Sequence, residues 1–421
     1  MSKSLLVGLT VAASVVAQAG NMDRPTGIKI GERLTLRPYV SLSYTFDSNV
    51  DQGRHSSKKA GSSWSIAPKL GFDYKGENWN VAGSAFYQYH AYANYPHKLN
   101  NGSWGENMSI DWTTEDAEGR GWAFRLSEDI HRYSQDDDMT ETHGRGIWRD
   151  RINLTGNAAI ERRFTERLHA ALTGSIYWLD YDNDENAYAP LYGWSRWTAG
   201  ANVGYMISPK SDVYIAGNYQ GYLQDNHKRR SYGGSGDEKT GNVANQSKGV
   251  SVHVGVQTRA TERFSYNVSA GWSRFEYAEG LSSNDGFTYS AAGQWKLSDT
   301  LNLMGSASSY YQPSEREYGA ALKCYTASVG LGKSFVRGKL SATADLSWRL
   351  EDHVYATYRD DDYNENIWAL RLGLNYTLNK YLGFFGSAEY QTEQSSGSDA
   401  TRNNAYDFER WRLSLGVNIT Y

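Results

Sequence analysis

Apolar and polar residues alternate along most of this chain. The clearest example is the last segment, in which the alternate apolar residues are Trp411, Leu413, Leu415, Val417, Ile419 and Tyr421. The same alternation runs through 34–46, 64–74, 250–256 and 340–350. A period of two is typical of a β-strand with one apolar face, because successive side chains of a strand point to opposite sides. The pattern therefore predicts an all-β protein.

The alternating runs are long, at about 10 to 13 residues each, which is about twice the mean strand of a soluble domain. A strand of this length suits a bilayer crossing at a tilt of about 45°. The mean hydropathy of −0.66, taken alone, would indicate a soluble protein. It does not decide the matter, because the strands of a membrane barrel alternate and average to low hydropathy.

Two kinds of connection alternate between the runs. Short turns include 75–78, 162–167, 208–211 and 379–380, and long polar connections include 47–63, 132–146 and 224–246. Bacterial outer-membrane barrels have short periplasmic turns and long outer loops. A propeller would need four short strands in each repeat, and here each repeat holds two long ones. We therefore predict an antiparallel up-and-down transmembrane β-barrel of about 18 strands, with 16 as the alternative.

Composition supports long strands and excludes one class of partner. The chain has 32 Tyr, 14 Trp and 42 Gly but only 7 Pro, and aromatic residues with little proline favour strands. Many of the Trp and Tyr residues fall at strand ends, where a membrane barrel carries its aromatic girdles. The net charge is −4 and both signs are spread along the chain. No basic face indicates nucleic acid.

The first residues resemble an export signal. Lys3 precedes an apolar stretch over 5–16, and a small-residue cleavage site follows at 17–19. The alternative, a first membrane helix, is disfavoured because the apolar stretch is short. We predict a signal peptide over 1–19, a periplasmic segment over 20–32 that plugs the base or hangs free, and a barrel over 33–421.

Arginine recurs on the face of the strands opposite the apolar residues, which is the face predicted to line the lumen. These residues are Arg37, Arg125, Arg149, Arg151, Arg349, Arg371, Arg410 and Arg412. Six of them are expected toward the outer mouth, in two sectors around strands five and six and around strands fifteen to eighteen: Arg149, Arg151, Arg349, Arg371, Arg410 and Arg412. Fixed positive charge in a pore favours anions, so these arginines are candidates for a selectivity zone. The alternative is a paired polar wall, with partners among Asp73, Asp111, Asp129, Asp345 and Glu389.

No motif predicts a metal site or catalysis. The run that begins at Asp180 has the acidic spacing of a calcium loop, but Glu185 and Leu191 stand where such a loop needs Gly and Glu. The nine histidines are scattered and form no H-E-x-x-H motif, and G-x-S-x-G is also absent from the sequence. A Ser–His pair across the barrel wall stays open. We predict no metal, no cofactor and no enzymatic activity, and we interpret Cys324 as a small packing residue.

Several hairpins resemble a known family. "RPYVSLSYTFDSNVD" at 37–51 is a first strand that ends in an Asp-x-Asn loop entry, and "ATERFSYNVSAGWSRFEYAEG" at 260–280 repeats the style of polar turn, alternating strand and acidic loop. In this the chain is similar to the putative β-barrel porin 2 family. The resemblance implies a bacterial outer-membrane barrel, often associated with exopolysaccharide or capsule production, and gives no catalytic residues. The last strand, Trp411 to Tyr421, also resembles the terminal signal read by the barrel-assembly machinery.

We therefore predict an outer-membrane, porin-like channel for passive passage of small polar, anionic or sugar-like solutes. The alternatives are an exopolysaccharide export pore and a plugged structural or surface-binding barrel, with an outer-membrane hydrolase ranked last. The expected partners are outer-membrane lipid and lipopolysaccharide, the barrel-assembly machinery, and a small polar solute or polysaccharide. The longest loop, over 221–249, is the candidate for folding into the lumen.

Overall fold

The computed structural model describes residues 27–50, 60–93, 101–115, 120–134, 150–181, 193–224, 245–276, 283–313, 320–355, 363–397 and 407–421. The predicted signal peptide and most of the loop at 221–249 lie outside these residues. The strands are β1 (Ile28–Ile30), β2 (Leu34–Asp47), β3 (Gly61–Lys75), β4 (Trp79–Tyr92), β5 (Asn101–Glu115), β6 (Gly121–Ser134), β7 (Asp150–Arg163), β8 (Leu168–Tyr181), β9 (Trp194–Ser208), β10 (Ser211–Gln224), β11 (Asn245–Thr258), β12 (Phe264–Glu276), β13 (Ser283–Ser298), β14 (Leu301–Pro313), β15 (Ala320–Phe335), β16 (Leu340–Tyr355), β17 (Tyr363–Thr377), β18 (Leu382–Gly397) and β19 (Phe408–Thr420). A 3-10 turn, η2 (Val336–Gly338), joins β15 to β16.

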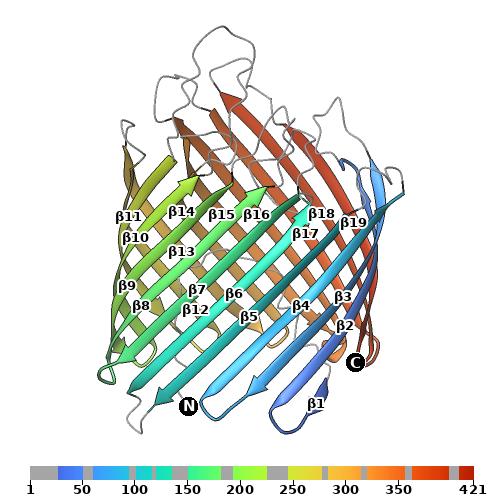
Figure 1. Cartoon of the computed structure of the whole chain (residues 1–421), viewed down its shortest axis with the longest axis horizontal. Coiled ribbons are helices and arrows are strands. Elements are labelled where there is room, and N and C mark those ends of the chain that lie inside the picture. The colour runs from blue at the N-terminus through green and yellow to red at the C-terminus, as the bar shows by residue number, and fades with distance from the viewer. Residues whose placement is uncertain are drawn as a thin grey trace.

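Strands β2 to β19 form a closed antiparallel barrel of 18 strands, each tilted across the cylinder wall (Figure 1). Every strand pairs with its neighbours in sequence, and β19 pairs with β2 to complete the ring. Closure satisfies the strand edges, which is the condition for a sheet to cross a bilayer. The predicted fold and the count of about 18 strands are confirmed. Within the described residues, no helix is long and apolar enough to span a membrane.

The apolar face of the strands lies on the outside of the barrel. Large apolar residues remain widely exposed there, for example Trp64 at 63 % and Leu415 at 68 % of their full surface. The residues between them point inward and are mostly less exposed. We call the strand ends that lead into the long connections the outer ends, and the ends that meet the short hairpins the turn ends. Figure 1 shows the short hairpins together at one end of the barrel, close to the C-terminus.

The seam between the first and last barrel strands is offset. β19 pairs with β2 only from Arg412 opposite Asp47 to Thr420 opposite Tyr39. Closer to the turn end, the edge of β2 pairs instead with β1, which lies opposite Leu34–Leu36. Of the predicted periplasmic segment 20–32, Ile28–Ile30 thus extend the wall as a short strand.

One pair of neighbouring strands separates toward the outer end. The ladder between β13 and β14 runs from Ser298 opposite Leu301 to Ser290 opposite Ser308 and goes no further. The remaining part of β13, down to Ser283, stays paired with β12, and β14 stays paired with β15 to Pro313. The wall therefore splits between β13 and β14 in its outer half.

Candidate functional site in the outer lumen

The inward-facing residues near the outer strand ends are buried on both sides of the ring. They include Asp47, Arg151, Leu179, Trp194, Tyr222, Phe275, Cys324, Glu351, Glu365, Glu393 and Arg410. A group on the inner wall of an open water-filled tube would keep contact with solvent. The outer part of the lumen is thus covered, and it divides into two arcs of different chemistry.

The first arc, the charged arc, comprises β16 to β19 and β2. A row of directly opposite residues crosses it with alternating charge: Asp345, Arg371, Glu389, Arg412 and Asp47. Opposite charges at facing positions of neighbouring strands stabilise the pairing, and a shift of register by one residue would move every one of them to the lipid side.

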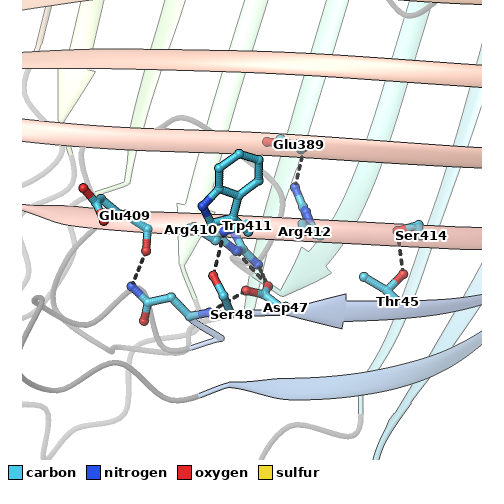
Figure 2. A network of polar contacts seen from close by, with 10 residues as sticks. Thr45, Asp47, Ser48, Glu389, Glu409, Arg410, Trp411, Arg412 and Ser414 are labelled. Carbon is cyan, nitrogen blue, oxygen red and sulfur yellow. Dashed lines mark hydrogen bonds and ion pairs between the residues drawn. The ribbon is translucent and has the colours of Figure 1, made fainter.

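Glu389 stands at the centre of this row and serves two arginines. Its Oε2 accepts a hydrogen bond from Arg412 at 3.0 Å and lies 3.6 Å from Nε of Arg371. The carboxylate thus joins β17, β18 and β19 through side chains as well as through the backbone. Figure 2 shows Arg412 directed toward Glu389 on the neighbouring strand.

Arg410 forms a buried ion pair with Asp47 across the barrel seam (Figure 2). Its Nε donates to Oδ2 of Asp47 at 2.7 Å, and the other carboxylate oxygen accepts the backbone N–H of Asn49 at 2.9 Å. Both side chains are less than a tenth exposed. A buried charge pair with its remaining oxygen hydrogen-bonded has the arrangement that offsets desolvation best.

A further ion pair lies on β16, between Arg349 and Glu351. Arg349 also donates a 3.9 Å hydrogen bond to the Cys324 sulfur, so the cysteine packs within the charged arc. Glu351 faces Glu365 on β17, and both side chains are fully buried. Glu393 on β18 is only 1 % exposed.

Carboxylates outnumber arginines in this arc. From the middle of its strands to their outer ends, the described inward side chains include Arg349, Arg371, Arg410 and Arg412 against Asp47, Asp345, Glu351, Glu365, Glu389 and Glu393. Arginines held in this way present little free positive charge to a passing ion. The role of the arginines in selectivity stays a prediction.

The other candidate arginines do not join this arc. Arg37 pairs with Asp73 near the turn end, and Arg125 lies 3.3 Å from Asp111. Arg151 is buried at the outer end of β7. Arg149 lies outside the described residues. Of the carboxylates named as alternative partners, Asp73, Asp111 and Glu389 make the ion pairs described above, and Asp345 lies opposite Arg371.

The second arc, the aromatic arc, comprises β8 to β12 on the far side of the lumen. Its inward-facing cluster consists of Leu179, Tyr181, Trp194, Tyr222 and Phe275, joined by Tyr311 of β14. The rings are in contact, with centroids of Trp194 and Tyr222 6.2 Å apart and those of Tyr222 and Phe275 5.1 Å apart. Sequence reasoning missed this cluster. In the sequence, its signal is a set of apolar residues at the outer ends of β8, β9, β10 and β12, in positions where the alternation predicts a polar, inward-facing residue.

Tyr177 forms the half-buried margin of the aromatic arc. Its ring packs 4.6 Å from that of Trp194, and the guanidinium of Arg196 lies 6.0 Å from its centroid. A half-buried aromatic ring beside a hydrogen-bond donor is an arrangement that can hold a molecule with one apolar face and several hydroxyls.

A polar cluster also lies at the turn end, on β7, β8 and β10. Nε2 of His169 contacts Oδ2 of Asp212 at 2.8 Å, and Nδ1 lies 3.9 Å from Oε1 of Glu161. The imidazole thus bridges two carboxylates. Among the described residues, no group of His, Cys, Asp or Glu has the geometry to hold a metal ion.

The C-terminal strand has the geometry expected of a lipid-facing element. Trp411, Leu413, Leu415, Ile419 and Tyr421 are exposed on its outer face, and Val417 is half-buried. The Tyr421 ring lies 6.3 Å from that of Tyr381 in the β17–β18 hairpin, as in an interfacial girdle. Its role as an assembly signal stays a prediction.

Solved structures with similar folds are distant in sequence. The FrpB iron transporter from Neisseria meningitidis (F3-3 variant) is 12 % identical with a TM-score of 0.45, over 95 % of this chain and 83 % of that one. The outer membrane protein OpdK from Pseudomonas aeruginosa is 10 % identical with a TM-score of 0.45, over 92 % and 99 %. The copper transporter OprC is 9 % identical with a TM-score of 0.47, over 93 % and 81 %. No curated protein matches the chain significantly.

A comparison with family sequence models shows which family the chain belongs to. The sequence model described as putative beta-barrel porin 2 matches residues 23–421, which include every strand of the barrel. The match and the closed barrel place the protein in the bacterial outer membrane. The chain therefore belongs to the putative β-barrel porin 2 family.

Proposed function

We propose that this protein is a channel for passive passage of small hydroxylated solutes, such as sugars and their derivatives. The observation that carries the proposal is the two-sided outer lumen, with paired charges on one arc and aromatic rings on the other. A sugar has apolar ring faces and polar edges. Aromatic side chains accommodate the faces, and paired Arg and carboxylate groups exchange hydrogen bonds with hydroxyls.

The charge balance favours a polar solute over a free anion. Glu389 contacts both Arg371 and Arg412, and Asp47 is paired with Arg410. An anion would have to displace these carboxylates, whereas a neutral polyol can hydrogen-bond to the half-exposed Arg371 without separating it from Glu389. We therefore expect no preference for anions.

Conductance of the purified protein in a planar bilayer tests the proposal. We expect single-channel steps with no preference for Cl⁻ over K⁺, and a reduction of current when neutral oligosaccharides are added. Tyr177→Ala should weaken this block by about tenfold, equivalent to about 1.4 kcal/mol. Tyr219→Ala, which removes a lipid-facing ring from β10, should leave the block unchanged.

Two outcomes would contradict the proposal. Strong anion preference with no effect of sugars would restore the arginines as the selectivity device. Absence of any conductance would favour a closed structural or surface-binding barrel, a second candidate that the buried inner wall at the outer strand ends supports. Export of a polysaccharide chain would require a wide passage, and long oligosaccharides that block the current would then also cross vesicle membranes.

A further inference from the structure

The split between β13 and β14 leaves an unusual arrangement in the barrel wall. In a regular barrel, the ladder would continue past Ser290 and Ser308 and bring Phe287 opposite Tyr311 on the lipid side. Instead, the backbone N–H of Tyr289 donates to the side-chain oxygen of Ser309 at 3.2 Å. The hydroxyl of Ser309 thus takes the place of a backbone carbonyl as the acceptor, and the ladder between β13 and β14 ends there.

Tyr311 occupies a position that its parity does not predict. It shares the parity of Leu303, which lies opposite the lipid-exposed Leu331 on β15. Yet Tyr311 is only 7 % exposed and belongs to the aromatic cluster of the lumen. The hydroxyl of Tyr222, on β10, donates to its backbone carbonyl at 3.3 Å.

Contacts with β13 show on which side of the wall Tyr311 lies. Gly286 is buried and has inward parity, two residues from the buried Thr288. A Cβ atom at Gly286 would lie 3.1 Å from the hydroxyl oxygen of Tyr311 and 3.3 Å from Nζ of Lys323. The outer face of β14 and β15 therefore packs against the inner face of β13, so their ends have folded inward past β13.

The folded-in part consists of 309–312 of β14 and 322–325 of β15, which we call the inner flap. Its two strands stay paired with each other, with Tyr310 opposite Cys324, and β15 also stays paired with β16, with Cys324 opposite Glu351. The flap therefore remains joined to the wall on the β16 side and is separated from it only on the β13 side. Leu322 and Cys324 are fully buried. Nζ of Lys323 lies 5.3 Å from the ring centroid of Tyr311 and 5.5 Å from that of Tyr325.

Two arrangements of the inner flap are available to the same residues. In the observed one, the flap packs against the aromatic cluster and buries Tyr311, while the outer part of β13 lacks its ladder with β14. In the other, the flap rejoins β13. This restores main-chain hydrogen bonds, whose loss is costly in the bilayer, but it exposes the Tyr311 ring to lipid. Because these terms oppose each other, a modest bias moves the balance between two discrete states.

We propose that the inner flap is the gate of the outer lumen, closed when it packs against the aromatic arc and open when β14 is paired with β13 along its full length. The gate rests on the proposed channel, since it has a role only if the lumen conducts. Solute that competes for the margin of the aromatic arc would release the flap from its closed position.

Cys324 provides a direct readout of the flap, because it is buried there and is the one cysteine of the chain. In protein folded in vesicles, its reaction with a water-soluble maleimide should be slow. Tyr311→Ala removes the ring that holds the flap and should raise the labelling rate by at least about tenfold. Tyr219→Ala removes a ring of the same size from the lipid-facing side and serves as the control. Equal protection of Cys324 in both variants would overturn the proposal.

A cross-link tests the open state without altering the cluster. Continuing the register places Gly286 opposite Gln312, so Gly286→Cys with Gln312→Cys, in a Cys324→Ser background, should form a disulfide when the ladder closes. Oxidation should then increase the current, and reduction should reverse it. Ala292→Cys with Ser306→Cys, opposite each other in the intact ladder, should cross-link with no change in current.

These readouts separate the gate from the channel. If the control pair cross-links and the Gly286–Gln312 pair does not, the flap does not rejoin β13 and the proposal fails. If labelling and cross-linking respond as expected but no variant conducts, the flap moves and the proposed channel function is what fails.

Discussion

The charged arc and the aromatic arc line the same lumen and are held together by different physical means. In the charged arc, the partners are fixed in pairs, and Asp47 and Arg410 lie more than 360 positions apart in sequence. In the aromatic arc, Trp194, Tyr222 and Phe275 pack as a continuous cluster. Ion pairs specify which residues face one another, whereas apolar packing tolerates exchange of partners. The comparison indicates that the charged arc sets the register and that the aromatic arc is the side able to rearrange.

The largest effect is expected at the buried ion pair that joins the two strands of the seam. Asp47→Ala should lower the free energy of unfolding by about 3–5 kcal/mol, because it leaves the Arg410 guanidinium buried without its carboxylate. Urea titration in lipid vesicles, followed by tryptophan fluorescence, measures it. The double variant Asp47→Asn with Arg410→Gln removes both charges and should recover most of the loss. A double variant as unstable as the sum of its parts would show that the pair is not coupled.

A smaller loss is expected in the aromatic arc. Phe275→Leu should lower the free energy of unfolding by about 1–2 kcal/mol, since neighbouring rings can partly fill the space. Phe287, on the next strand, is 56 % exposed on the lipid side, so Phe287→Leu is the matched control and should change little. If Phe275→Leu costs as much as Asp47→Ala, the aromatic arc is as rigidly specified as the charged arc.

The smallest effect is expected for a pair outside both arcs. Arg125 and Asp111 are 38 % and 46 % exposed near the turn end of their strands. Arg125→Gln should lower the free energy of unfolding by less than about 1 kcal/mol, as for other solvated ion pairs. The same urea titration, at low and high salt, checks it. A loss comparable to that of Asp47→Ala would mean that burial is not what separates the arcs.

Sequence parity was enough to predict the wall but not the lumen. The alternation that ends in Leu415 and Tyr421 placed the lipid face correctly, because one face of every strand meets lipid. It also placed Arg412 and Glu389 on the inner face. Parity within a strand carries no information on register between strands, so the contact of Glu389 with both Arg371 and Arg412 required the structure.

The aromatic arc was missed for a related reason. Leu179 and Trp194 stand on the inward parity, where an open channel would carry polar groups, and parity alone does not show which inward residues of different strands meet. The register between β8 and β9 places these two residues directly opposite each other. Tyr311 is the opposite case, because its parity predicts lipid contact and the split of the wall after Ser308 carries it into the lumen.

The short strand β1 has a consequence for how the barrel assembles. The β1–β2 hairpin closes over three residues, from Ile30 opposite Leu34, whereas the β19–β2 seam joins segments at opposite ends of the chain. Local contacts form early and distant ones late. β1 can therefore cover the lower edge of β2 while the rest of that edge still awaits β19. This short strand thus shields Leu34–Leu36 of that edge from pairing with another chain.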